Sequence, residues 1–228
     1  MLRMLSLAMA IFLSGLVQAA EPNADDVAKI LKWLPQSVLN DGVSITDIAH
    51  ITLSKKEPAL LATASFENRG RNFSQSSILV RPQLEQAREV EGVSTLLYVN
   101  EDQNGVYDMN EDGVSEVVLE SVSSGQGGMA AYRSLVYFDG WKQIILHDVY
   151  YYDYAGSCAG VNGKSMECFI NDVTWNFDYL FGEKRSMIEM LRFLNEDKWM
   201  IKVNVFALKN NKMVLVSPTL SKVISMPK

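Results

Sequence analysis

The chain is poor in histidine and cysteine, the residues that supply nitrogen and sulfur ligands. Its 228 residues include two histidines, His50 and His147, and two cysteines, Cys158 and Cys168. A structural zinc site needs four such ligands in closely spaced pairs, so the sequence argues against zinc. His147 precedes Asp148 in a predicted strand, where neighbouring side chains point to opposite faces and cannot form a catalytic relay directly. No Gly-x-Ser-x-Gly motif marks a nucleophilic serine.

Clustered basic residues and long apolar runs are also lacking. Lysine and arginine total 21 against 27 acidic residues, a net charge of −6, and the basic side chains are scattered apart from Lys55–Lys56 and Lys184–Arg185. Nucleic-acid binding requires a clustered basic face, so no nucleic-acid partner is expected. The longest apolar run, residues 4–16, is shorter than the roughly 20 residues that a transmembrane helix needs. We therefore expect no membrane span, and the oligomeric state stays open.

The first twenty residues have the three parts of a secretory signal peptide. Arg3 gives a basic start, residues 4–16 are almost wholly apolar, and residues 17–20 offer small side chains for cleavage. The sequence thus predicts a signal peptide at 1–20, a single β-rich domain at 21–228, and a periplasmic or secreted location. In an oxidising compartment Cys158 and Cys168, which flank the hairpin signal Asn162-Gly163, are expected to form a disulfide, with free thiols as the alternative.

The pattern of apolar residues predicts a mainly β fold (β-rich α+β), an antiparallel meander of hairpins with an N-terminal helix. Asn23 can cap a helix that runs to Leu34 and stops at Pro35. Residues 82–90 are read as a helical turn or a surface excursion, and residues 187–194 fit both helix and strand. Strands are expected at 45–53, 60–66, 76–80, 93–99, 114–122, 131–138, 141–153, 173–179, 199–207 and 213–216.

Residues 108–116, Asp-Met-Asn-Glu-Asp-Gly-Val-Ser-Glu, place oxygen-bearing side chains at alternating positions before a strand. Calcium prefers six to eight oxygen ligands. Asp108, Asn110 and Asp112 occupy positions 1, 3 and 5 of a wrapping loop, while Val114 offers a backbone carbonyl and Glu116 a carboxylate. The sequence therefore predicts a structural calcium ion. An ordinary acidic turn is the alternative, because Asn and Asp-Gly are common turn residues.

This loop resembles the calcium-loop signature of the FG-GAP/integrin-alpha-like repeat, in which Asp-x-Asn-x-Asp-Gly-x-x-Asp/Glu lies between two antiparallel strands. The resemblance implies ligand roles for Asp108, Asn110, Asp112, Val114 and Glu116. Full propellers of this family have seven blades and repeat the loop, whereas this chain is too short and carries one loop. The resemblance therefore extends to the loop and its metal, not to the propeller.

Aromatic residues could carry recognition of a protein or carbohydrate partner, since tyrosine and tryptophan offer rigid contact surfaces with a polar edge. The alternative places them in the core of the sheet. The candidates are Trp141, Tyr150, Tyr152, Tyr154 and Trp175.

These features predict an exported, soluble, calcium-stabilised β domain that acts as a binding or accessory module in the bacterial envelope, and that is more simply read as a non-enzyme. Two alternatives stay open. One is a small periplasmic or secreted hydrolase that uses carboxylates near the calcium loop. The other is an inhibitor or immunity-type protein that blocks a partner enzyme.

Overall fold

The structure is a computed structural model that describes residues 22–90, 95–96, 105–125, 128–153, 171–179, 184–195, 198–217 and 219–225. The predicted signal peptide, Tyr154 and the predicted Cys158–Cys168 disulfide lie outside these ranges, as does the side chain of Tyr152.

The N-terminal helix is confirmed. Helix α1 (Ala24–Trp33) begins after Asn23, whose Oδ1 accepts a hydrogen bond of 2.9 Å from the backbone N–H of Asp25. Pro35 follows it and precedes the short helix α2 (Gln36–Leu39). The first sheet has the order β1-β2-β3-β4 and is antiparallel throughout. Its elements are β1 (Val43–Thr52), β2 (Pro58–Phe66), β3 (Gln75–Arg81) and β4 (Gln86–Glu89), with 3₁₀ turns η1 (Ser54–Lys56), η2 (Arg71–Phe73) and η3 (Pro82–Leu84).

The second sheet has the order β5-β7-β8-β9, and β6 pairs with β7 beside β5. The strands expected at 131–138 and 141–153 form a hairpin, for which the sequence predicts Asp139-Gly140 as the two turn residues. The turn residues are instead Gly140 and Trp141, because Asp139 already pairs with Lys142. Gly140 has φ +60°, the value that glycine adopts readily at the first position of a tight hairpin turn. The strands are β5 (Thr95–Leu96), β6 (Val106–Tyr107), β7 (Glu116–Gly125), β8 (Gly128–Asp139) and β9 (Lys142–Asp153).

The third sheet resolves the ambiguous segment at 187–194, which is a strand. The sheet has the order β10-β11-β12-β13, with β14 pairing along another part of β12. The sequence did not predict β14. The strands are β10 (Asn171–Asp178), β11 (Ser186–Asn195), β12 (Lys198–Lys209), β13 (Lys212–Leu215) and β14 (Leu220–Ser225).

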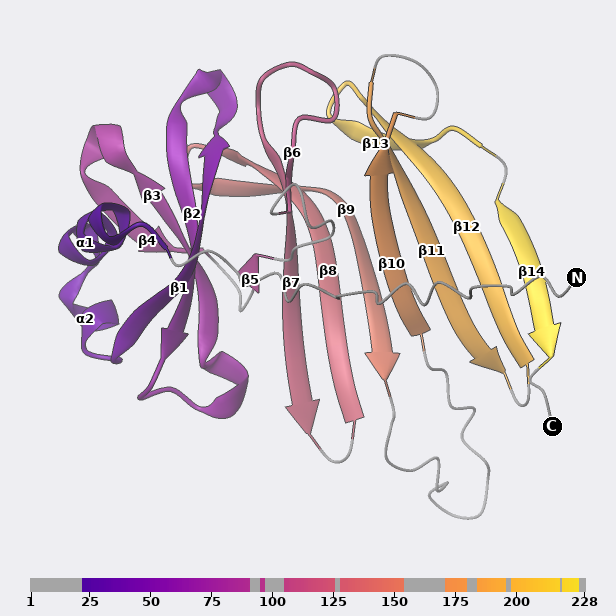
Figure 1. Cartoon of the computed structure of the whole chain (residues 1–228), viewed down its shortest axis with the longest axis horizontal. Coiled ribbons are helices and arrows are strands. Elements are labelled where there is room, and N and C mark those ends of the chain that lie inside the picture. Colours follow the sequence, from indigo (N-terminus) through magenta and orange to yellow (C-terminus); the bar gives the residue numbers. More distant parts are fainter. Residues whose placement is uncertain are drawn as a thin grey trace, which may run out of the picture.

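The three sheets follow one another along the molecule, with the helices against the first sheet at the far end from the third (Figure 1). Strand β7 shows why they stack face to face. Val117 and Leu119 are buried in a core shared with the first sheet, whereas Val118 is buried in a core shared with the third. A separate core joins the helices to the other face of the first sheet through Ile30 and Leu34.

This arrangement confirms the mainly β fold class with its antiparallel hairpins and N-terminal helix. Within the described ranges, no helix is both long and apolar enough to cross a membrane.

Candidate functional site

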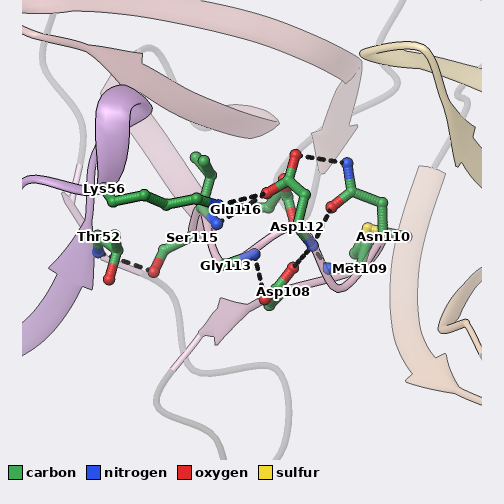
Figure 2. A network of polar contacts seen from close by, with 10 residues as sticks. Thr52, Lys56, Asp108, Met109, Asn110, Asp112, Gly113, Ser115 and Glu116 are labelled. Carbon is green, nitrogen blue, oxygen red and sulfur yellow. Dashed lines mark hydrogen bonds and ion pairs between the residues drawn. The ribbon is translucent and has the colours of Figure 1, made fainter.

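The acidic loop of residues 108–116 joins β6 to β7 and is fixed to two different sheets. On one side, the N–H of Ser115 donates to the carbonyl of Thr52 in β1 at 2.8 Å, and the Ser115 Oγ accepts from the Thr52 N–H at 2.9 Å. On the other side, Met109 is fully buried in the core between the second and third sheets. Figure 2 shows both anchors around the loop. The loop therefore lies where all three sheets meet.

Side-chain oxygens of the loop accept hydrogen bonds from its own backbone. The two carboxylate oxygens of Asp108 accept from the N–H groups of Asp112 and Gly113, at 3.0 and 2.8 Å. Asn110 Oδ1 accepts from Asp112 N at 3.1 Å, and Asp112 Oδ1 accepts from Val114 N at 2.8 Å. Gly113 has φ +75°, a conformation that favours glycine. These bonds fix Asp108, Asn110 and Asp112 around one tight turn (Figure 2).

Glu116 is the buried member of the group, with 2% of its surface exposed. Its Oε2 accepts a hydrogen bond of 2.7 Å from the backbone N–H of Met109. Burial raises the pKa of Glu116 to about 7, and the negative charges of Asp108 and Asp112 add to this effect. The charges of the three carboxylates therefore act on one another, and a cation among them would relieve that repulsion.

The donor chemistry of the loop suits a hard cation, since it offers three carboxylates, an amide oxygen and the carbonyl of Val114. In the structure the carboxylates are turned toward backbone N–H groups, and among the described residues no three His, Cys, Asp or Glu side chains are grouped as a metal site. Each carboxylate has about four acceptor positions, so these hydrogen bonds leave acceptor positions for an ion. Lys56 forms an ion pair with the loop, since its Nζ lies 3.7 Å from Asp112 Oδ1.

Two of the cavities formed by the described residues adjoin the loop. The larger has a volume of about 1020 Å³ and lies between the loop, the start of β11 and the β12–β13 hairpin. The smaller, of about 530 Å³, lies beside Asp108 and Glu111. Arg185 lines both cavities, and Glu116 lines neither.

The three predicted partner-binding aromatics whose side chains the structure describes, Trp141, Tyr150 and Trp175, are not gathered on one surface. Trp175 is 1% exposed and lies in the core between the second and third sheets, so its predicted role in partner binding is wrong. Side chains of β10 alternate between the two faces of the third sheet, and Trp175 lies on the face that the second sheet covers. Trp141 is partly buried beneath the guanidinium groups of Arg81 and Arg88, at 5.0 and 4.5 Å from its ring centroid. Tyr150 is 60% exposed.

A buried polar network that the sequence did not reveal lies between the same two sheets. Glu189 of β11 is 3% exposed, and its Oε2 lies 2.9 Å from His147 Nε2 and accepts from Trp175 Nε1 at 3.1 Å. Its Oε1 accepts from Asn204 Nδ2 at 3.0 Å. His147 thus contacts Glu189, 42 residues away in the sequence, while Asp148 bonds to Tyr132. Because a network with each carboxylate oxygen in use and little exposure offers no place for a substrate, we assign it a structural role.

Comparison with known proteins adds no relative. No protein-family model, curated protein or solved structure matches this chain.

Proposed function

We propose that this protein is an exported binding or accessory module whose acidic loop binds a structural calcium ion. The observation that carries the proposal is the gathering of Asp108, Asn110 and Asp112 around one turn, with the carboxylate of Glu116 buried beneath them. The resemblance of the loop to FG-GAP calcium loops supports it, and so does the placement of the loop between the antiparallel strands β6 and β7. The composition of residues 1–20 supports export.

The ion would be held by the side chains of Asp108, Asn110, Asp112 and Glu116 and by the carbonyl of Val114. Its role would be mechanical, because the loop is anchored to the first sheet at Ser115 and to the core beside the third sheet at its Met109 end. Neutralising the repulsion among three carboxylates would stabilise the turn and, through those anchors, the packing of the sheets. The binding role of the module would then rest on a rigid scaffold.

The alternative of a hydrolase finds less support. A buried carboxyl group with a raised pKa beside ionised aspartates is a pattern of glycosidase active sites. A general acid must also come within hydrogen-bond distance of the substrate, however, and Glu116 lines neither of the two cavities beside the loop. The side chain is instead engaged with the backbone of Met109. The inhibitor alternative stays a prediction.

Thermal melting in chelator and in calcium tests the proposal. Extracellular calcium sites have dissociation constants of about 10⁻⁴–10⁻³ M. At roughly 1 mM calcium, mass action would stabilise the fold by about 0.4–1.4 kcal/mol. For a domain of this size we therefore expect the melting temperature to rise by roughly 1–5 °C. Magnesium should give a smaller rise, because it keeps its waters and requires octahedral geometry.

Two substitutions in the same loop distinguish a proposed calcium ligand from a residue outside the ligand set. Asp112→Ala removes a proposed ligand and should abolish the calcium shift. Glu111→Ala also removes one carboxylate, but at a position outside the proposed ligand set, and should keep the shift. Lys56→Met should strengthen calcium binding a few-fold, because Lys56 competes for Asp112. A wild type that melts at the same temperature in calcium and in chelator, with no binding heat at millimolar calcium, would refute the proposal.

A further inference from the structure

The larger cavity beside the acidic loop has a charge pattern that the calcium proposal does not use. Three cationic side chains line it against one carboxylate, that of Asp112. Three asparagines and Ser186 add polar hydrogen-bonding groups, and the remaining lining residues, Ala207, Leu208 and Val216, are apolar. The cationic residues are Lys184, Arg185 and Lys209, and the asparagines are Asn110, Asn210 and Asn211.

Two of these cations are available to a ligand. Neither Lys184 nor Lys209 forms an ion pair with a carboxylate anywhere in the described part of the chain, and both are exposed. They come from different elements, Lys184 preceding β11 and Lys209 ending β12, yet they line the same cavity. The positive charges of Lys184 and Lys209 repel each other across the cavity, and an anion bound between them would remove that repulsion.

The wall that carries the amides is held in one conformation. Lys209 pairs with Lys212 across a two-residue hairpin turn, and the turn residues Asn210 and Asn211 have φ of 51° and 56°. Positive φ at both central positions defines the turn type that matches the twist of antiparallel strands, so the turn is well fixed. Beyond β13, the N–H of Val216 donates to the carbonyl of Val205 at 2.8 Å. The backbone that carries the amides of Asn210 and Asn211 is therefore fixed before any ligand arrives.

Arg185 is also held in place. Its guanidinium lies 5.2 Å from the ring centroid of Tyr179, within the range of a cation–π contact. On the opposite wall Asn110 and Asp112 project from the acidic loop, Asn110 on the side nearest the third sheet (Figure 2). The volume of about 1020 Å³ is at the upper end of the range for small-molecule sites. It accommodates a ligand of several rings rather than a simple inorganic ion.

We propose that this cavity binds a sugar that carries carboxylate or phosphate groups. The lysines and Arg185 would neutralise the acidic groups, and the asparagine amides and Ser186 would exchange hydrogen bonds with the hydroxyls. The proposal names the ligand of the binding module proposed above, so it rests on that function; it does not require the calcium ion.

Isothermal titration calorimetry on the full chain without its predicted signal peptide tests the proposal, with three probes in buffer that contains chelator. Trigalacturonate carries carboxylates, glucose 6-phosphate carries a phosphate, and maltotriose has three rings and no charge. We expect at least one acidic probe to bind at least tenfold more tightly than maltotriose and to weaken as salt increases. Binding of trigalacturonate alone indicates carboxylates as the recognised group, and binding of glucose 6-phosphate alone indicates phosphate.

Variants connect the binding to this cavity. Lys184→Gln and Lys209→Gln each remove a charge from an exposed side chain. Each should lower the affinity for the acidic probe about fivefold or more and leave the melting temperature unchanged. Lys142→Gln removes an exposed lysine that does not line the cavity and should have no effect. The proposal is overturned if maltotriose binds as tightly as the acids, if both lysine variants bind like the wild type, or if neither acid binds at about 10 mM. Because the chelator removes calcium, a failure of the calcium proposal appears only in the melting experiment above.

Discussion

Removing the charge of Glu189 should destabilise the packing of the second sheet against the third. Three strands supply the groups that approach this carboxylate: His147 from β9, Trp175 from β10 and Asn204 from β12. Glu189→Gln keeps the shape of the side chain but replaces one acceptor oxygen with a donor NH₂ group. At least one buried N–H group then loses its acceptor. An orphaned buried donor costs about 1–3 kcal/mol, and more when the bond is to a charged group.

We therefore expect Glu189→Gln to lower the free energy of unfolding by about 2–3 kcal/mol at pH 7. Glu189→Ala should cost more, about 3–5 kcal/mol, because it orphans every donor of the group and leaves a cavity. Urea denaturation followed by tryptophan fluorescence and by circular dichroism measures both values. Glu67→Gln, at an exposed position, is the matched control and should stay within about 0.5 kcal/mol of the wild type.

The loss in free energy of unfolding caused by Glu189→Gln should depend on pH in a defined direction. Burial acts to raise the pKa of Glu189, but the hydrogen bonds from His147, Asn204 and Trp175 outweigh it, and the pKa lies below its ordinary value of 4.5. The ionised carboxylate therefore contributes stability that is complete above pH 4.5 and is lost as the pH falls through the lower pKa of the folded state. The difference between wild type and Glu189→Gln should shrink between pH 7 and pH 3. A variant as stable as the wild type at pH 7, or a difference that stays constant down to pH 3, would refute the reasoning.

Two further predictions concern a buried hydroxyl and the cysteines. The hydroxyl of Tyr107 is buried and has no hydrogen-bond partner among the described residues, and its ring stacks on Phe177 at 3.9 Å between centroids. Tyr107→Phe should therefore keep the stack and leave the free energy of unfolding unchanged or raise it by about 1 kcal/mol, and a loss above about 1 kcal/mol in urea denaturation would contradict this. The peptides that contain Cys158 and Cys168 should be linked in non-reducing peptide mapping. Reduction of this disulfide should lower the free energy of unfolding by roughly 2–3 kcal/mol, and two free thiols in the exported protein would contradict the prediction.

Local patterns predicted most of the fold because the relevant information lies within a few residues. The alternation of Val173, Trp175 and Phe177 with polar neighbours predicted β10, and the two apolar segments at 199–207 and 213–216 predicted β12 and β13. The turn of the β8–β9 hairpin was misplaced by one residue, since Gly140 supplies the positive φ at the first turn position rather than the second. The type of the turn follows from the register of two strands, which the turn residues alone do not determine.

Pairing with neighbouring strands determines the secondary structure of the segments that the sequence left open or missed. Residues 86–89 contain good helix formers, yet they form β4 because β3 offers an unpaired edge where Ala87 can be buried. The apolar residues in 187–194 fit the spacing of a helix and that of a strand, and pairing with β10 and β12 makes the segment a strand. Strand β14 has exposed apolar residues, and it forms by pairing with β12.

The candidate site shows the same division between local and distant information. The acidic loop is one continuous run of nine residues, so the sequence alone brought its five proposed ligands together. The cavity beside it has walls from residues 110 and 112, 184–186, 207–211 and 216, and no motif joins segments so far apart. What the sequence shows of it is the pair Lys184–Arg185, one of two adjacent basic pairs in a chain whose other basic residues are scattered. That pair becomes informative only when the fold places Lys209 and the acidic loop around the same hollow. The function of such a cavity therefore depends on charges from distant segments that only the fold brings around one hollow.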